Sequence, residues 1–269
     1  MDSESSISVR VEGVALNFRG VGADDHVLAV MRESGAIYEQ SVLLKILHQL
    51  NGRKGAAVDA GAFIGTHSVF FSRICGLAPV LAFEADPETF TVLSQNLKDN
   101  DARSVVAQNV ALGNRIGRAE LRQGAAGNRG TVSVDPRDDG TLAITTIDVA
   151  VAEMAGWEPV VLIKIDVEGA EIDVLQGAEE TITRDMPLLC VEAHGPAQFA
   201  ELARFLHSCG YGIVDCLGGS PTYIADVTRT GDLKAVLSRR IWQLRSRMRG
   251  TWTRAAMRRL AIIVGPWQN

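Results

Sequence analysis

Residues 160–175, with the sequence VVLIKIDVEGAEIDVL, constrain the fold of this chain more than any other stretch. The first six residues are apolar and mostly β-branched apart from one lysine, a pattern typical of a strand buried on both faces in a parallel sheet. Gly169 then marks a turn, and the apolar spacing after it predicts a short helix. The carboxylates of Asp166, Glu168 and Glu171 therefore follow the carboxyl end of a buried strand, where ligands bind in open α/β sheets.

The same alternation of buried strand and amphipathic helix runs through most of the chain. The expected strands are residues 56–59, 80–83, 105–112, 160–165, 188–192, 211–214 and 222–225. The expected helices between them are residues 66–74, 87–97, 147–154, 170–178 and 196–208. Such alternation indicates βαβ units, so the sequence predicts an α/β fold with a doubly wound, mostly parallel sheet and helices on both faces.

Three further regions flank or interrupt this unit. Residues 1–55 are expected to form an N-terminal cap, in which a strand or hairpin precedes an amphipathic helix at 39–50. Residues 113–146 are punctuated by glycines and predict a hairpin-rich insertion at the upper edge of the sheet. Residues 229–269 are expected to form an arginine-rich helical tail, which leaves residues 56–228 as the main domain.

The composition is that of an ordinary soluble protein. With 269 residues, 46% hydrophobic and 22% charged, the chain can bury one substantial core. It contains no apolar run long enough to span a bilayer, and its first residues are polar and acidic, so we expect a cytoplasmic location. The four cysteines form no CxxC pair, which favours reduced, mostly buried thiols over disulfides or a metal site.

Charge is unevenly distributed along the chain. Residues 233–269 contain one lysine and eight arginines without an acidic residue, a charge of +9, so residues 1–232 carry −14 of the net −5. A basic amphipathic helix in the tail could contact an anionic membrane face. We favour the simpler interpretation, in which the tail packs on the acidic body or on a second copy of the chain in a homo-oligomer. The acidic body would repel phosphates, so no nucleic acid partner is expected.

A glycine turn joins the first expected strand of the main domain to its helix. Asp59, Gly61 and Gly65 follow the pattern D-x-G-x-x-x-G, which allows close backbone approach at a helix N-terminus. Taken alone, this pattern fits an ordinary tight βα connection. Glu84 at the end of the next strand can bind the two hydroxyls of a ribose, so the pair favours a nucleoside-bearing cofactor. Phe63 occupies the second glycine position of the dinucleotide fingerprint, which argues against NAD.

Three segments together resemble one family. VDAGAFIGTHS, the FEADP that ends the second strand, and IKIDVEGAEIDVLQGA are similar to the FkbM-type S-adenosylmethionine-dependent methyltransferases over about residues 38–194. The resemblance implies a class I methyltransferase fold with a seven-stranded sheet. It also implies that residues 56–228 bind S-adenosylmethionine and that the acceptor is a small-molecule or glycan hydroxyl, on a sugar or a secondary metabolite.

The resemblance also implies which residues contact the cofactor. Asp59, Gly61 and Gly65 would surround the methionine part, Glu84 the ribose, and Asn109 with Ala111 the adenine edge. The full expected set is Asp59, Gly61, Ala62, Phe63, Gly65, Glu84, Ala85, Asn109, Ala111 and Asp166. The family pattern often has Asn at the position of Phe63, so this chain departs from it there.

Methyl transfer from a sulfonium requires alignment of donor and acceptor and removal of the acceptor's proton. The expected catalytic residues are Asp166, Glu168, Glu192 and His194, which follow neighbouring strands. His194 is our choice of base, since its ordinary pKa lies near neutral pH; the alternative is that it caps the following helix. The same four residues could hold a divalent metal, but carboxylates with one imidazole are a loose signature, and no metal is predicted. Glu171 is expected to be a helix-start acid that complements the macrodipole.

The sequence therefore predicts an S-adenosylmethionine-dependent O-methyltransferase. Two alternatives from other classes stay open: a non-catalytic nucleoside-binding or scaffold protein of the same fold, and a nicotinamide-dependent oxidoreductase. Binding of S-adenosylmethionine without methyl transfer would favour the first, and binding of NAD(P) the second.

Overall fold

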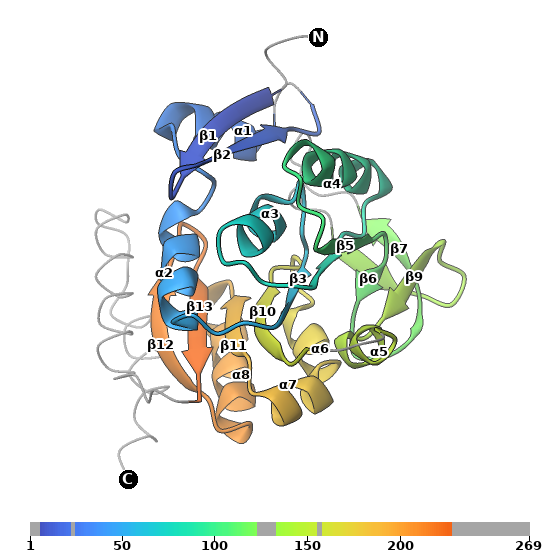
Figure 1. Ribbon diagram of the computed structural model, residues 1–269. Coiled ribbons are helices and arrows are strands. Elements are labelled where there is room, and N and C mark those ends of the chain that lie inside the picture. Colours follow the sequence, from blue (N-terminus) through green and yellow to red (C-terminus); the bar gives the residue numbers. More distant parts are fainter. Residues whose placement is uncertain (1–5, 23–24, 123–132, 155–157, 228–269) are drawn as a thin grey trace, which may run out of the picture.

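A seven-stranded sheet forms the centre of the computed structural model, which describes residues 6–22, 25–122, 133–154 and 158–227 (Figure 1). In spatial order the strands are β12 (Gly212–Leu217), β13 (Thr222–Asp226), β11 (Leu188–Glu192), β10 (Val160–Ile165), β3 (Ala56–Ala60), β4 (Val80–Phe83) and β5 (Val105–Gln108). Neighbours from β11 to β5 pair in parallel, and β13 is antiparallel to both β11 and β12. The predicted class I methyltransferase fold is confirmed.

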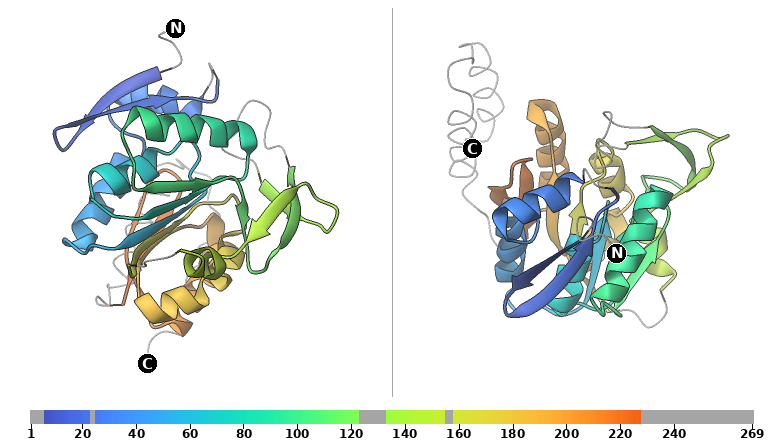
Figure 2. Two further views of the ribbon diagram at one scale, coloured as in Figure 1. Left: turned by 45° about the vertical axis from the view of Figure 1, so that its right-hand side comes forward. Right: turned by 90° about the horizontal axis from the view of Figure 1, so that it is seen from above.

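Helices cover both faces of this sheet (Figure 2). One face carries α2 (Gln40–Leu50), α3 (Thr66–Arg73) and α4 (Pro87–Asp99). The other carries α5 (Ile147–Ala152), α6 (Glu171–Gln176), α7 (Glu179–Asp185) and α8 (Gly195–Ser208). Successive strand residues point to opposite faces, so Ala57 packs with the first helical layer and Val58 with the second. Both layers need apolar strand residues, which explains the continuous apolar runs in the sequence.

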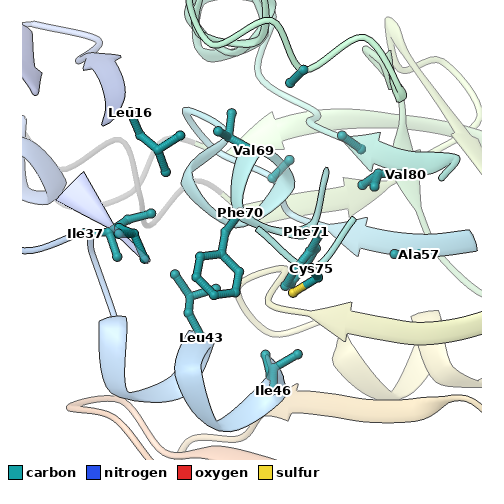
Figure 3. Packing of buried hydrophobic residues seen from close by; sticks show 14 of the residues in the cluster. Leu16, Ile37, Leu43, Ile46, Ala57, Val69, Phe70, Phe71, Cys75 and Val80 are labelled. Carbon is teal, nitrogen blue, oxygen red and sulfur yellow. The ribbon is translucent and has the colours of Figure 1, made fainter. Parts of the chain in front are cut away.

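The first helical layer contains the larger aromatic side chains of the core. Phe70 and Phe71 of α3 are fully buried and lie between α2 and the sheet, with Leu43 and Ile46 on the α2 side (Figure 3). The two rings meet edge to face, with centroids 6.5 Å apart. This packing fixes α2 and α3 against each other, and both helices begin beside the site described below.

The N-terminal region adds a hairpin and a helix to the first layer. Strands β1 (Ser6–Val11) and β2 (Val14–Arg19) form a two-stranded antiparallel sheet, and α1 (His26–Ser34) follows. The side chains of Asn96 on α4 and of Asn100 at its C-cap each accept a hydrogen bond from the backbone of β2 and donate one to it. The sequence predicted the hairpin and α2 but not α1, a helix whose start is capped by the Asp25 side chain.

Residues after β5 form a separate small sheet with the order β6-β9-β7-β8. Its strands are β6 (Ala111–Leu112), β7 (Gly117–Arg122), β8 (Ser133–Pro136) and β9 (Leu142–Thr145). The sequence predicted a third strand and its exit over residues 105–112; the strand is β5, and the exit leaves the main sheet and joins the small one at β6. A Cβ at Gly140 would lie 2.1 Å from the Ala119 carbonyl oxygen, so glycine allows the close approach between two of these strands.

The other predicted elements agree with the structure to within a few residues, except that α7 was not predicted as a separate helix. All four cysteines are free, and Cys75, Cys190 and Cys216 are buried, as expected. In the described ranges, no helix has the length and apolar character needed to cross a bilayer. The arginine-rich tail, residues 229–269, lies outside the described residues.

Candidate active site

The candidate site lies where the direction of the chain across the sheet reverses. From β3 the chain proceeds through β4 to β5 on one side, and later returns to β10 and β11 on the other. Ligands in doubly wound folds bind at the carboxyl ends of the strands beside this switch point. Asp59 lies within the end of β3, Asp166 directly follows β10, and Glu192 ends β11, so the tertiary structure brings these predicted residues to one edge.

The glycine turn after β3 passes close to the end of β10. Gly61 has a φ of +75°, and a Cβ there would lie 1.7 Å from the Asp166 carbonyl oxygen. Gly65, with a φ of +88°, begins α3, whose first turn presents free backbone N–H groups to this edge. Only glycine can occupy position 61, because both the close approach and the left-handed conformation exclude a side chain.

A buried ion pair holds this turn against β10. Lys164 Nζ donates to the Gly61 carbonyl oxygen at 2.7 Å and lies 3.3 Å from Asp59 Oδ1 and 3.5 Å from Asp166 Oδ2. Asp59 Oδ2 also accepts from Ser68 Oγ at 2.6 Å. Burial lowers the pKa of Lys164, but the neighbouring Asp59 and Asp166 carboxylates outweigh burial and raise it above the ordinary value. The lysine therefore stays charged and partly neutralises the acidic edge.

Lys164 was missed as a site residue in the sequence. The available signal was a lone lysine inside an apolar run predicted to be buried on both faces, since such a lysine requires a partner. Its own strand supplies one partner, Asp166, and the neighbouring β3 supplies the other.

Glu84 joins the glycine turn to the end of β4. Its Oε2 accepts from the Phe63 backbone N–H and its Oε1 from that of Asp86, both at 2.9 Å. Burial raises the pKa of Glu84 to about 7, although the two backbone hydrogen bonds lower it. Phe63 has a φ of +48°, a conformation that Asn adopts more readily. The hydrogen bond to Glu84 uses only the backbone of residue 63. It is therefore kept although Phe63 stands where the family pattern often has Asn.

The residues expected at the adenine lie beyond Glu84. Asn109 Nδ2 donates to the carbonyl oxygens of Glu84 at 2.8 Å and Ala85 at 3.0 Å. Ala111 is buried in β6, where it pairs with Ile144. Asn109 thus fastens the backbone after β4, which positions Glu84 at the sheet edge.

Three of the expected catalytic residues, Asp166, Glu192 and His194, contact one another in series. Asp166 and Glu192 share a side-chain hydrogen bond. Burial raises the pKa of Glu192 and its bond to Asp166 adds to the effect. Burial also acts to raise the pKa of Asp166, but Lys164 and the bond from Glu192 outweigh it and lower that pKa. His194 Nε2 lies 3.3 Å from Glu192 Oε2, and its side chain is 46% exposed.

The alternative interpretation of His194, as a residue that caps the following helix, agrees with its place at the start of α8. This residue occupies the N-cap position, but its ring makes no capping hydrogen bond; instead its backbone N–H donates to Gln198 Oε1 at 2.6 Å. Glu168 stands apart from the Asp166–Glu192–His194 chain. Its φ is +56°, and burial, with Asp166 nearby, raises its pKa to about 7.

Glu171 has a structural role in the loop before α6. It is buried in the first turn of α6, and its Oε1 accepts from the Gly169 N–H at 2.9 Å. Its Oε2 accepts from Gln198 Nε2 at 3.2 Å. Both carboxylate oxygens hold the protein's own groups, so Glu171 orders the loop that carries Glu168.

Tyr38, Glu39 and His67 reach the same edge from the first helical layer and were missed in the sequence. Glu39 precedes α2 with a φ of +53°, and its Oε2 lies 3.5 Å from His67 Nε2. Burial raises the pKa of Glu39 to about 7, and burial with Lys164 lowers that of His67 to about 4. Burial and Glu39 raise the pKa of Tyr38 to about 12. Glu39 resembled an ordinary helix-start acid in the sequence, which offers no local signal for this contact.

Within the part of the chain that the structure describes, no group of three or more His, Cys, Asp or Glu side chains is arranged to hold a metal ion.

The sequence pattern of the methyltransferase FkbM domain matches residues 59–213, more than half of the chain. The chain belongs to this family. The match begins at Asp59 and contains every predicted catalytic and cofactor-binding residue. The resemblance stated from the three sequence segments is confirmed.

Similar proteins include methyltransferase sdnD from Sordaria araneosa, which is 32% identical over 46% of this chain and 60% of its own length. Hexuronic acid methyltransferase AglP from Haloferax volcanii is 28% identical over 62% of this chain and 67% of its own length. A crystal structure of methyltransferase FkbM from Methylobacillus flagellatus KT has a TM-score of 0.48 at 18% identity, over 64% of this chain and 43% of that one. The chain thus spans 60% of sdnD and less than half of the crystallised FkbM protein.

Proposed function

We propose that this family member is an S-adenosylmethionine-dependent O-methyltransferase that acts on a hydroxyl of a sugar, glycan or secondary metabolite. The observation that carries the proposal is the joint placement of the Gly61 turn, Glu84 and the Asp166–Glu192–His194 chain at one sheet edge. The glycine turn and Glu84 are suited to a methyl donor that carries a nucleoside. Asp166, Glu192 and His194 are suited to an acceptor hydroxyl that must lose a proton.

The residues present fit the donor. The absence of a Cβ at Gly61 lets the turn pass against Asp166, and Glu84 at the next strand is positioned for a ribose diol. When bound, S-adenosylmethionine supplies an electrophilic methyl group on a cationic sulfur. The excess of carboxyl groups at this edge favours a ligand that carries positive charge.

His194 is the base in this proposal. Its Nε2 faces Glu192, so Nδ1 is the ring nitrogen left to take the proton of the acceptor hydroxyl. Glu192, whose raised pKa and bond to Asp166 favour its protonated form, orients the ring through its contact with Nε2. Because His194 is half exposed, the proton can pass to solvent after each turnover.

A sugar acceptor receives support from the name of one relative. AglP is a hexuronic acid methyltransferase, so sugar acids are the first acceptors to test. Carboxyl groups and an imidazole at the mouth of the site also suit a polyhydroxylated ligand, whose O–H groups need acceptors.

The test combines a labelled methyl donor with a panel of hexuronic acids, neutral sugars and phenolic metabolites. The expected result is one product whose mass has increased by a methylene. His194→Ala should abolish most of the turnover and leave donor affinity near the wild-type value, whereas the exposed control His26→Ala should change neither. Donor binding without transfer to any acceptor would favour the scaffold alternative, and full activity in His194→Ala would remove this residue from the mechanism.

A further inference from the structure

Glu39 reaches the candidate site from outside the segment that carries the family pattern. It lies 20 residues before Asp59, where the matched region begins. Its left-handed backbone at the start of α2 turns the side chain toward α3, where Oε2 lies 3.5 Å from His67 Nε2. On the opposite side, a Cβ at Gly218 would lie 3.3 Å from Glu39 Oε1, so the turn between β12 and β13 confines the carboxylate. The Glu39 side chain is only 15% exposed.

His67 presents a buried nitrogen without a hydrogen bond. Its Nε2 has no hydrogen-bond partner among the described residues, although the side chain is only 7% exposed. A buried polar atom left in this state costs about 1–3 kcal/mol, and native proteins rarely retain one without a reason. A ligand group placed beside Glu39 and His67 would provide the missing partner.

Acidic groups outnumber cations around Glu39. Asp166 and Lys164, at the end of β10, act on its charge, and His67 on α3 faces it. Asp59 acts in turn on His67, and Glu192 acts on the neighbouring Tyr38. These described groups contain four carboxyls and one cation. Among the described residues, Lys164 forms its ion pairs with Asp59 and Asp166, and its charge lowers the pKa of Glu39 without outweighing burial. The balance favours a cationic ligand group.

The backbone acceptor at the head of the glycine turn is already engaged. The carbonyl oxygen of Gly61 accepts from Lys164 Nζ at 2.7 Å. An ammonium beside the turn has three N–H donors, so it needs further acceptors, which side chains can provide. Glu39 and His67 lie 3.5 Å apart, and the charge of Asp166 acts on both of them, so these three side chains are candidates for those acceptors.

We propose that Glu39, His67 and Asp166 form an ammonium subsite, which takes the amino group at the amino-acid end of the methyl donor. This inference rests on the proposed function, because it presumes S-adenosylmethionine as the donor. The subsite lies beside β3 and β10, whereas Glu84 lies at the end of β4. Different carboxylates would therefore contact the amino-acid end and the ribose of the donor. Burial raises the pKa of Glu39 to about 7, and a bound ammonium would favour its ionised form.

The test compares two ligands that differ in the amino-acid end. S-adenosylhomocysteine carries the ammonium and carboxylate, and 5′-methylthioadenosine retains the adenosine but lacks both. Glu39→Gln should weaken the binding of S-adenosylhomocysteine about tenfold or more, as expected for a lost hydrogen bond to a charged group. Binding of 5′-methylthioadenosine should stay within about twofold, and this ligand also shows that the variant is folded. The control Glu33→Gln, an exposed carboxyl on α1, should change neither affinity.

Each other outcome has a distinct meaning. Equal weakening of both ligands, or no weakening of either, would overturn the ammonium subsite and leave the proposed donor intact. Unchanged S-adenosylhomocysteine affinity with slower turnover would overturn it too, and would assign Glu39 to the acceptor. If the wild-type protein bound neither ligand, both the proposed function and the subsite would fail.

Discussion

Replacing Glu39 by Gln should stabilise the ligand-free protein at alkaline pH. Burial raises the pKa of Glu39 to about 7 from an ordinary value of 4.5, so the folded state resists ionisation of this group more than the unfolded state does. Each pH unit between the two values is worth about 1.4 kcal/mol, which sets an upper limit of about 3 kcal/mol. Gln keeps the size of the side chain and its capacity to accept a hydrogen bond, but carries no charge.

The direction of this pH dependence follows from the binding of a proton to Glu39 in the folded and unfolded states. Below about pH 4.5 Glu39 is protonated in both states and stabilises the fold as the neutral Gln would. Its contribution is lost as the pH rises through about 7, because the folded protein must then bury a carboxylate. Glu39→Gln should therefore exceed the wild type by less than about 1 kcal/mol at pH 5 and by about 2–3 kcal/mol at pH 8.5.

Urea unfolding of both proteins at the two pH values measures this difference directly. The measurement is made without ligand, since a bound ammonium would stabilise the carboxylate and reverse the advantage. Equal stability of the two proteins at pH 8.5, or a loss of stability of similar size at both pH values, would refute the assignment of Glu39 as a destabilising buried acid. The combination of a more stable protein with weaker donor binding is the pattern expected of a functional residue.

Three further substitutions test the rest of the site. Glu84→Ala should weaken S-adenosylhomocysteine and 5′-methylthioadenosine binding alike, by about 1–3 kcal/mol in calorimetry, because both ligands keep the ribose; an unchanged dissociation constant would exclude the ribose contact. Lys164→Met leaves two carboxylates without their buried cation and should cost about 3–5 kcal/mol in urea unfolding, so a loss below about 1 kcal/mol would contradict the ion pair. Gly61→Ala would place its Cβ 1.7 Å from the Asp166 carbonyl oxygen and should lose donor binding and more than about 2 kcal/mol of stability. The control Gly117→Ala, where a Cβ meets nothing within 4 Å, should stay within about 1 kcal/mol of the wild type, and equal effects of the two changes would argue against the close approach.

The strands of the main sheet were predictable because they are buried on both faces. Residues 160–165 show this best: the apolar run in the sequence is β10 in the structure, with the same bounds. The pairing of the exit from β5 was not predictable, since only partners distant in the sequence decide which sheet each half of residues 105–112 joins. In the sequence, Gly177 lies near the end of the helix predicted over residues 170–178, where it needs no distant contact to explain it. A Cβ there would lie 2.1 Å from the Gly113 carbonyl oxygen, so a contact with a distant segment explains this glycine.

The acidic edge of the sheet was determined by the sequence alone. Asp59, Glu84, Asp166 and Glu192 each end or follow a strand, and parallel strands place their carboxyl ends along one edge, so local pattern was sufficient to bring them together. His194 follows the same logic.

Only the tertiary structure decided which groups surround these carboxyl groups and how their charge is neutralised. Lys164 is enclosed by groups from β3 and its own strand, and Glu39 and His67 arrive from helices packed on one face of the sheet. Burial and neighbouring charge set the pKa of each group, and both depend on contacts between segments distant in the chain. Periodicity and spacing describe only near neighbours, which is why the sequence predicts where the ligands bind but not which side chains neutralise, protonate or confine them.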